Sequence, residues 1–438
     1  MAQLRGFTKT KCSQLVFPIH IENFMKSTTE QYRDVVAFFL DVIQKEQWVL
    51  SSDEWLKEIE KLTIQNKNNP QPKYNLKNNF GKYPSGFRRA AIAESFGEAS
   101  SWRTRYKKWQ EKKQKHEEKN TLRKSKGKKE ILFKERPPVY PEKCSTWISY
   151  YATEYEWIDN RHILMKLFTG KSYIKYKFSL AQPVSAPKGY QKGSPTLVQK
   201  KNGWELQVPF VLPKGTIKLK KVTERVQEAN FRMCVVDLGI NHHAVMTIQD
   251  DKGTVYATKF ISGKKDNHLR KLRLEQIVRL QKQTKIIPEG ERFATDLWDK
   301  VKNMNNDIAH SVSKQIVNFA ELHFANTIVF EHLDNLKPEK GTKSKWLNQK
   351  FMFWVKGRIV KYTKYKAIHK GIVVNRVTPK NSSRRCPYCG QLAIVRYSQG
   401  KKYGVSLSHC LCCKTHDLNS DFVGSLGVGT NFRVKYCI

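Results

Sequence analysis

The chain has 438 residues, 39% of them hydrophobic, which is enough for two or three domains with separate cores. Its 80 Lys and Arg residues outnumber 39 Asp and Glu residues, and the net charge of +41 indicates a polyanionic partner. The longest apolar runs, such as residues 35–43, are too short to span a bilayer, and the N-terminus lacks a signal-peptide core. We therefore expect a soluble intracellular protein with no membrane partner, in the cytoplasm or nucleoid of a prokaryote or the nucleus of a eukaryote.

The first region of the chain combines one strand with several helices. Residues 12–21 have the pattern of a short strand. Residues 27–47 open with Ser and Thr, which are typical helix caps, and then space their apolar residues as a helix does. A helical region is predicted to follow.

The last helix of that region, predicted from about Ser100, carries aromatic residues on one face. Trp102, Tyr106 and Trp109 fall on this face, and Arg and Lys occupy the others. One interpretation is an aromatic stripe packed into a core, with a solvated basic face. Another is a helix laid against RNA or DNA, with basic side chains on the phosphates. Both can hold together.

A change of pattern then separates the helices from a sheet. Residues 112–143 are rich in Lys and end in prolines, which indicates a mobile basic segment and a domain boundary. From Cys144 to about Lys221, short alternating runs are separated by Gly, Pro and Asn, a pattern typical of a small β-barrel or sheet. The first strand segment is expected to join it, which makes the helical region an insertion.

Two apolar strands of the third region end in carboxylates. From Phe231 onward the pattern predicts a buried strand ending in Asp237, a second strand through Ile248, and a third strand after a turn. Residues 326–337 predict another buried strand, which ends in Glu331. A carboxylate at the end of an apolar run needs a cation or a hydrogen-bonding partner, so both acids are candidate site residues.

A third carboxylate, Asp421, precedes Gly424, Ser425 and Gly427, small residues suited to a helix packed closely on a sheet. The three acids can meet only through the fold. If they do, they form an all-oxygen site suited to Mg²⁺. Two such ions about 3.5–4 Å apart would support in-line hydrolysis of a phosphodiester without a covalent enzyme intermediate.

Nine cysteines, four of them in two CxxC pairs, favour a metal site in a reducing compartment over disulfides. The pairs have the spacing C-x₂-C-x₂₀-C-x₂-C, at or just beyond the usual zinc-ribbon range, and consist of Cys386, Cys389, Cys410 and Cys413. Cys412 is an alternative ligand, although it breaks the two-residue spacing. Four thiolates leave no open position, so a structural Zn²⁺ would fasten this insertion to the sheet and fix where the Asp421 helix begins.

Two adjacent histidines, His242 and His243, follow Asp237 closely. Successive side chains of a strand point to opposite faces, so at most one of them can face the carboxylates. Ordinary packing is the simpler interpretation for both.

The order of these features resembles the RuvC nuclease domain of the TnpB family, transposon-encoded relatives of type V CRISPR effectors and of eukaryotic Fanzor proteins. Residues 379–390, PKNSSRRCPYCG, closely match the zinc motif of the family, P-x-x-T/S-S-x-x-C-x-x-C-G. The family then places an N-A-D-x-N-A-A-like segment, and this chain has NSDFVGS, with Ser420 for Ala and Val423 for the second Asn. Asp417, in HDLNS, offers a competing register, and we favour Asp421. The N-terminal half shows a weaker likeness to the family, chiefly at residues 83–102.

This resemblance implies an RNA-guided DNA endonuclease. A transposon-derived guide RNA would direct the protein, as a monomer with its RNA, to double-stranded DNA beside a target-adjacent motif. A RuvC-like site with two Mg²⁺ ions at Asp237, Glu331 and Asp421 would then hydrolyse phosphodiester bonds. Two alternatives remain: a nuclease-inactive RNA-guided DNA-binding repressor or targeting protein, and an unguided RuvC-like transposase or resolvase.

The expected fold is α+β and multidomain. It combines an RNase H-like (RuvC) mixed β-sheet domain carrying an inserted zinc ribbon with an N-terminal wedge-like β-barrel carrying a helical recognition insertion. The expected domains are the wedge (1–25 and 140–228), the helical domain with its basic linker (26–139), the nuclease domain (229–380 and 415–438) and the zinc ribbon (381–414).

Overall fold

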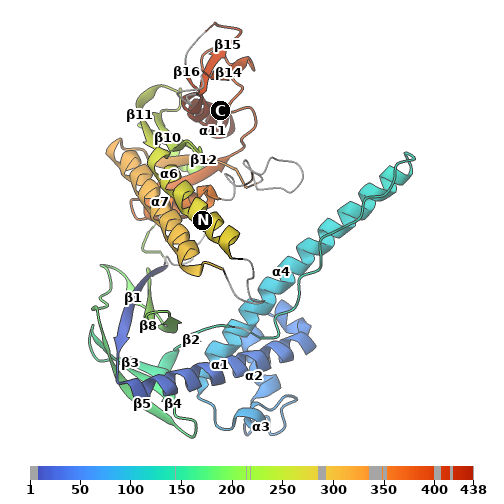
Figure 1. Cartoon of the computed structure of the whole chain (residues 1–438), viewed down its shortest axis with the longest axis vertical. Coiled ribbons are helices and arrows are strands. Elements are labelled where there is room, and N and C mark those ends of the chain that lie inside the picture. The colour runs from blue at the N-terminus through green and yellow to red at the C-terminus, as the bar shows by residue number, and fades with distance from the viewer. Residues whose placement is uncertain are drawn as a thin grey trace. The chain divides into compact units, whose positions relative to one another are not determined.

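Two compact units make up the computed structural model, an N-terminal unit of residues 4–214 and a C-terminal unit of residues 215–438, shown in Figure 1. The structure describes residues 8–143, 145–213, 215–217, 219–284, 293–334, 348, 353–398, 406–414 and 418–437. Among these residues, no helix has the length and apolar character needed to cross a membrane. Each unit has its own apolar core, so each is described by itself.

The N-terminal unit is built on an eight-stranded sheet with the order β2-β7-β8-β1-β5-β4-β3, in which β6 also pairs with β8. Its strands are β1 (Thr8–Val16), β2 (Ile148–Ser149), β3 (Tyr155–Trp157), β4 (His162–Phe168), β5 (Tyr173–Leu180), β6 (Gln191–Lys192), β7 (Thr196–Lys200) and β8 (Gly203–Val211). The first strand pairs with both β8 and β5, so the helices that follow it are inserted between strands of one sheet. In the described part, β2 and β3 stand at the two ends of the order, and closure into a barrel stays a prediction.

The helices of this unit pack on the sheet through apolar faces. They are α1 (Ile19–Lys45), η1 (Gln47–Ser51), α2 (Trp55–Thr63), α3 (Leu76–Phe80), α4 (Ser85–Lys124) and η2 (Ala152–Glu154). The helix predicted to open at Ser27 begins earlier, at Ile19, directly after Pro18. The fixed φ of Pro18 suits a helix start, and the hydroxyl of Thr29 bonds inside the helix to the Met25 carbonyl at 2.8 Å.

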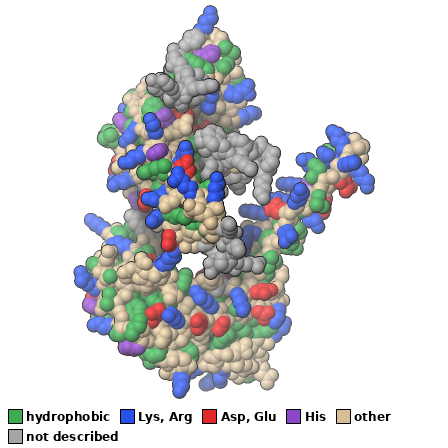
Figure 2. Space-filling model, viewed as in Figure 1, with side chains coloured by type: hydrophobic (Ala, Val, Ile, Leu, Met, Phe, Trp, Pro, Cys, Tyr) green, Lys and Arg blue, Asp and Glu red, His purple; other side chains and the backbone are tan. Residues whose placement is uncertain are grey.

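The helix predicted from Ser100 is the second half of α4, which begins at Ser85 and has 40 residues. The buried residues of α4 lie between Gly86 and Ala99, so its later turns extend beyond the core as an arm (Figure 1). Lys and Arg side chains line this arm in Figure 2.

The segment predicted to be mobile, residues 112–143, lies along the same arm, and its first part is helical where a linker was expected. Its first part continues α4 to Lys124, and residues 128–140 return along the helix. The indole N–H of Trp102 donates to the Pro138 carbonyl at 3.0 Å, and that of Trp109 donates to the Glu135 carbonyl at 2.9 Å. The aromatic stripe therefore binds the returning chain, and the basic side chains stay in solvent.

The C-terminal unit contains a mixed five-stranded sheet with the order β11-β10-β9-β12-β13. Its strands are β9 (Met233–Asp237), β10 (His242–Gln249), β11 (Val255–Ser262), β12 (Thr327–Glu331) and β13 (Val373–Val377). The first three form an antiparallel meander, and β12 pairs in parallel with both β9 and β13. The sequence pattern located β9, β10, β11 and β12 correctly.

Helices cover both faces of this sheet. They are α5 (Val222–Arg225), α6 (Lys264–Gln283), α7 (Thr295–Leu322), α9 (Lys356–Ile368) and α11 (Ser420–Tyr436). Cys234 and Val236 of β9 pack with α7 and α9, whereas Met233 and Val235 pack with Val428 of α11. This two-residue alternation is how a strand with two buried faces divides its side chains.

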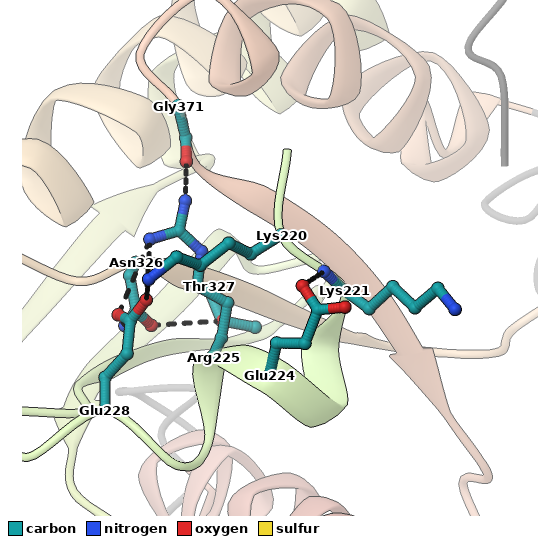
Figure 3. A network of polar contacts seen from close by, with 8 residues as sticks. All are labelled: Lys220, Lys221, Glu224, Arg225, Glu228, Asn326, Thr327 and Gly371. Carbon is teal, nitrogen blue, oxygen red and sulfur yellow. Dashed lines mark hydrogen bonds and ion pairs between the residues drawn. The ribbon is translucent and has the colours of Figure 1, made fainter. Parts of the chain in front are cut away.

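A polar network anchors the start of this unit (Figure 3). It consists of Lys220, Lys221, Glu224, Arg225, Glu228, Asn326, Thr327 and Gly371. Glu228 accepts from the Asn326 amide at 2.6 Å, and the Arg225 guanidinium donates to the Gly371 carbonyl at 2.8 Å. These bonds fasten α5 to the turn before β13, and the residues after α5 to the beginning of β12. The division between the two compact units falls after residue 214, and the domain bounds given by the sequence stay a prediction.

A small three-stranded sheet lies between β13 and α11 in the sequence. It consists of β14 (Ile394–Ser398), β15 (Ser406–Cys410) and β16 (Leu418–Asn419), with the order β14-β15-β16. Its antiparallel pairing joins the segment between the two CxxC pairs to the residues that open α11.

Candidate functional site

Two of the predicted acids lie side by side at the ends of parallel strands. The register of β9 and β12 pairs Val236 with Phe330, so Asp237 and Glu331 occupy the next position. Val235 of β9 and Val329 of β12 pack with α11. Asp237 and Glu331 each lie two residues further along the same strand, so both acids face α11 as well. Neighbouring strands are about 4.8 Å apart, so the two carboxyl groups share one end of the sheet.

The third acid, Asp421, lies in the first turn of α11, where a helix N-terminus favours negative charge. One turn further, the α11 backbone lies against the first acid, since a Cβ added at Gly424 would come 2.3 Å from Asp237 Oδ2. A Cβ at Gly427 would meet the Ser382 carbonyl oxygen at 1.8 Å. Glycine at these positions lets the helix approach the sheet, and it brings Asp421 to the end that carries Asp237 and Glu331. We call this end the acid edge.

The electrostatics of the acid edge favour a cation. Burial, and then the charges of Glu331 and Asp421, raise the pKa of Asp237 well above its ordinary value. Burial also raises the pKa of Glu331, although a hydrogen bond with Ser382 opposes the shift. Carboxylates that repel one another away from water are stabilised by a bound metal ion, and oxygen ligands suit Mg²⁺. Within the described residues, the three carboxylates do not form a ligand group as close as that of the cysteines below.

A histidine that the sequence analysis set aside joins this edge. His242 Nδ1 lies 2.9 Å from Asp421 Oδ2, whereas His243 Nε2 lies 2.9 Å from Asp266 Oδ2 on α6. The pairing of β10 with β11 shifts between His242 and Ala244, which is a β-bulge at His243. The two histidines therefore contact acids on different helices, His242 on α11 and His243 on α6, as the alternation of a strand predicts.

A cation from the cysteine module also acts on the acid edge. The charge of Arg396, an exposed residue of β14, lowers the pKa of both Asp237 and Glu331 and so opposes the effect of burial. No motif in the sequence marks Arg396. The only signal available was its place between the two CxxC pairs.

The four predicted zinc ligands form one cluster. Their sulfur atoms all lie within 4.8 Å of one another, and the residues are Cys386, Cys389, Cys410 and Cys413. The Sγ atoms of Cys386 and Cys413 are 3.6 Å apart, as are those of Cys389 and Cys410. Tetrahedral Zn²⁺ with bonds of about 2.3 Å places its sulfur ligands about 3.8 Å apart, so the cluster fits a structural zinc ion. Cys412 is exposed and is not in this group.

The cysteine module is packed against the beginning of α11. Cys386 and Cys410 share a small apolar cluster with Val423 of the helix. The Ser408 and Ser420 hydroxyls are 2.7 Å apart. The Asn419 side chain, at the end of β16, accepts from the backbone N–H groups of the first helical turn. A metal that fixes the module therefore also fixes the turn that carries Asp421. The competing acid, Asp417, lies outside the described residues, as does Cys144.

The fold and these two sites define an α+β protein with clustered carboxylates on a mixed sheet and a four-cysteine module beside them. The Aq_aa04 family model matches residues 9–169, and the model of the Cas12f1-like TNB domain matches residues 357–428. The chain is 30% identical to the TnpB-like protein aq_aa05 of Aquifex aeolicus strain VF5 over 228 residues, which are 49% of this chain and 69% of that protein. It therefore belongs to the TnpB-like proteins, of the TnpB and Cas12 type.

Two further similarities are more distant. The chain is 28% identical over 126 residues to the CRISPR-associated endodeoxyribonuclease Cas12f1 of Sulfoacidibacillus thermotolerans, covering 29% of this chain and 27% of that protein. A cryo-EM structure of CasPhi-2 bound to crRNA and phosphorothioate DNA is 11% identical, with coverage of 98% and 92% and a TM-score of 0.48.

Proposed function

We propose that this protein is an RNA-guided DNA endonuclease whose cutting site is the acid edge. The observation that carries the proposal is the meeting of Asp237, Glu331 and Asp421 at one end of the mixed sheet in a member of the TnpB-like family. In this proposal the C-terminal unit is an RNase H-like (RuvC) domain with a zinc ribbon at residues 381–414. The N-terminal unit supplies the wedge-like barrel and its helical insertion. A relative named as an endodeoxyribonuclease supports the same class of activity.

The three carboxylates would hold Mg²⁺, which matches their chemistry and the raised pKa of Asp237 and Glu331. Two Mg²⁺ ions held by these residues would supply Lewis-acid activation of a phosphodiester and of an attacking water. Of the chain's own groups, His242 orients Asp421 through the 2.9 Å contact, and Arg396 brings a positive charge suited to the substrate phosphate. Zn²⁺ at the cysteine cluster would keep Asp421 in position.

The partners in this proposal are a guide RNA and a double-stranded DNA target. The charge of +41 suits the many phosphates of a guide scaffold and a heteroduplex, so binding should weaken steeply as salt rises. Base pairing would select the target, and the protein would bind the backbone and a short flanking motif. The protein would act as a monomer with its RNA.

The test is to express the chain with its flanking genomic DNA, sequence the RNA that co-purifies, and offer Mg²⁺ with guide-matched plasmids behind randomised flanks. Asp237→Ala and Glu331→Ala should each lower cutting by about a thousandfold or more, because each removes a metal ligand, while target binding is retained. Asp334→Ala is the matched control, since Asp334 is an exposed acid three residues beyond Glu331. Full cutting by either acid variant contradicts the assignment of the site. Bound RNA and motif-dependent binding without cutting by the wild type would favour a targeting protein, and absence of bound RNA would favour an unguided enzyme.

A further inference from the structure

A histidine and a carboxylate meet at the rim of the acid edge, and we call His242 and Asp421 the rim pair. The two atoms in contact are Nδ1 of the imidazole and Oδ2 of the carboxylate, which are 2.9 Å apart. The side chains are 28% and 33% exposed, so water and ions can reach the pair from solvent. Besides burial and Glu331, Asp421 raises the pKa of Asp237, so a cation held by the rim pair would stand in the field of all three acids.

The backbone around His242 holds the imidazole at this place. The turn from β9 to β10 is so tight that a Cβ added at Gly239 would come 2.8 Å from the His242 carbonyl oxygen. The pairing of β10 with β11 shifts between His242 and Ala244, and bulges of this kind re-aim side chains beside active sites. The Phe260 ring of β11 meets the imidazole edge to face, with the ring centroids 5.4 Å apart. These contacts fix the imidazole, and the capped first turn of α11 fixes Asp421 separately.

The distance within the rim pair fits a bound ion as well as it fits a hydrogen bond. Two neighbouring ligand atoms of an octahedral ion, each about 2.1 Å from it, lie about 3 Å apart. The two atoms of the rim pair are 2.9 Å apart, and each belongs to a separately fixed element. An ion can therefore bind both atoms while the two side chains keep their places.

The atoms of the rim pair differ from those of the other two acids. Asp237 and Glu331, on neighbouring strands, offer only oxygen, which suits Mg²⁺. The rim pair offers one oxygen and one imidazole nitrogen, and imidazole favours first-row transition ions. Mn²⁺ is such an ion and shares the preference of Mg²⁺ for carboxylates and waters. The acid edge thus has an all-oxygen position and a mixed position, and the mixed position favours Mn²⁺.

We propose that His242 is a metal ligand, and that the ion position beside Asp421 takes Mn²⁺ in preference to Mg²⁺. Of the two ions of the acid edge, one is held by Asp237 and Glu331, and the other by the rim pair together with water. The inference rests on the proposed nuclease function for the use of this ion in cutting, whereas the binding of the ion does not depend on it. His242 then does more than orient Asp421, because it decides which ion the edge selects.

Electron spin echo envelope modulation detects nitrogen atoms bound to Mn²⁺ and needs no substrate. The full-length protein, with the RNA that co-purifies, is grown with ¹⁵N-histidine or unlabelled histidine and given one equivalent of Mn²⁺ together with Mg²⁺, which occupies the RNA phosphates. We expect nitrogen modulation that changes with the label; RNA nitrogens carry no label and cannot cause the change. In His242→Phe, which keeps a ring beside Phe260 and loses both nitrogens, the label-dependent part should disappear. Its absence from the wild type overturns the proposal, as does its survival in His242→Phe.

A second histidine–aspartate pair provides the matched control. His162 Nδ1 lies 2.7 Å from Asp159 Oδ2 in the N-terminal unit, so it presents the same two kinds of atom on other elements of the chain. His162→Phe should keep the full modulation. Loss of the modulation in His162→Phe would mean that an exposed pair of this kind binds Mn²⁺ without the acid edge, and would overturn the site.

Ion affinities separate a ligand from a residue that only positions Asp421. Melting temperatures measured over series of Mn²⁺ and Mg²⁺ concentrations give an apparent Kd for each ion. His242→Phe should weaken Mn²⁺ binding about tenfold or more, as for the loss of a group that holds a metal, and should weaken Mg²⁺ binding much less. Equal losses for the two ions would mean that His242 acts only through Asp421, and would overturn the proposal.

A second variant protects the test if His242→Phe fails to fold. In His242→Gln the amide can still donate to Asp421, but the histidine nitrogen is lost, so the label-dependent modulation and the preference for Mn²⁺ should both disappear. An unchanged preference in His242→Gln overturns the proposal. None of these measurements involves cutting, so failure of the His242 ligand is distinct from failure of the proposed nuclease.

Discussion

The arm of the N-terminal unit and the acid edge of the C-terminal unit use charge in opposite ways. Residues 103–136 contain 15 Lys and Arg residues and 5 Asp and Glu residues. They are spread along α4 and along the segment that returns beside it, residues 128–140, which we call the strap. The acid edge gathers three carboxylates from distant parts of the sequence and withdraws two of them, Asp237 and Glu331, from water. Spread charge can bind any phosphate backbone and tolerates change at single positions. Charges that meet at one site support one kind of chemistry. The geometry of such a site depends on every helix and strand that supplies a residue to it.

The test with the largest expected effect asks whether Asp421 or Asp417 is the third acid of the acid edge. Asp421→Ala should lower guide-dependent cutting by about a thousandfold or more, because the charge of Asp421 acts on Asp237 together with that of Glu331, and Asp417→Ala should cut as the wild type does. The measurement is the single-turnover cutting rate of a guide-matched plasmid. If only Asp417→Ala is inactive, the register of the last motif was chosen wrongly.

The second test concerns the module that positions Asp421. Cys410→Ser should abolish zinc content and lower the stability of the C-terminal unit by about 4 kcal/mol or more, since a buried ligand of the cluster is lost. A melting temperature lower by roughly 10 °C follows for a unit of this size. Zinc analysis and thermal melting measure both effects. Cys412→Ser is the control and should change neither; a zinc-free Cys410→Ser protein with normal melting would contradict the structural role.

The sequence predicted the acid edge better than its surroundings, for physical reasons. Strands buried on both faces give continuous apolar runs, so the acids that end them, Asp237 and Glu331, stand out. His242 did not stand out, because a bulge in the strand pairing cannot be seen in the residues themselves. The strap over the arm was missed because Trp109 bonds a backbone carbonyl, and every residue offers one. Arg396 was missed because the cysteine module has no periodic pattern of apolar residues from which the orientation of its side chains could be predicted.

A third test uses the pH dependence of the metal-free protein. Because the pKa of Asp237 is raised in the folded state, the native protein holds more protons than the unfolded chain, and stability falls as pH rises above the ordinary carboxyl pKa of about 3.9. Asp237→Asn should therefore melt higher than the wild type in chelator between about pH 5 and 8, and should gain less on addition of Mg²⁺.

The control for that test has the opposite sign. Hydrogen bonds with Thr254 and Tyr256 lower the pKa of Asp250 despite its burial, so its stabilising contribution is present at neutral pH and is lost as pH falls. Asp250→Asn should accordingly melt lower than the wild type at neutral pH. If both variants shift the melting temperature in the same direction, the result contradicts a pKa of Asp237 that is raised by burial and by the neighbouring acids.

The smallest effect is expected on the arm, where single charges are interchangeable. Lys115 and Lys119 are exposed and lie on turns of α4 that have no buried residues. Replacing both by alanine should weaken binding of any nucleic acid by a similar factor and lower the slope of log affinity against log salt by about 2, if each contacts a phosphate. Fluorescence anisotropy over a salt series measures the slope. Trp109→Ala, which removes the anchor of the strap and leaves the charge intact, should alter stability more than the slope. An unchanged slope in the lysine variant would mean that the arm is a solvated face, and the positive charge used for binding would then have to lie elsewhere in the chain.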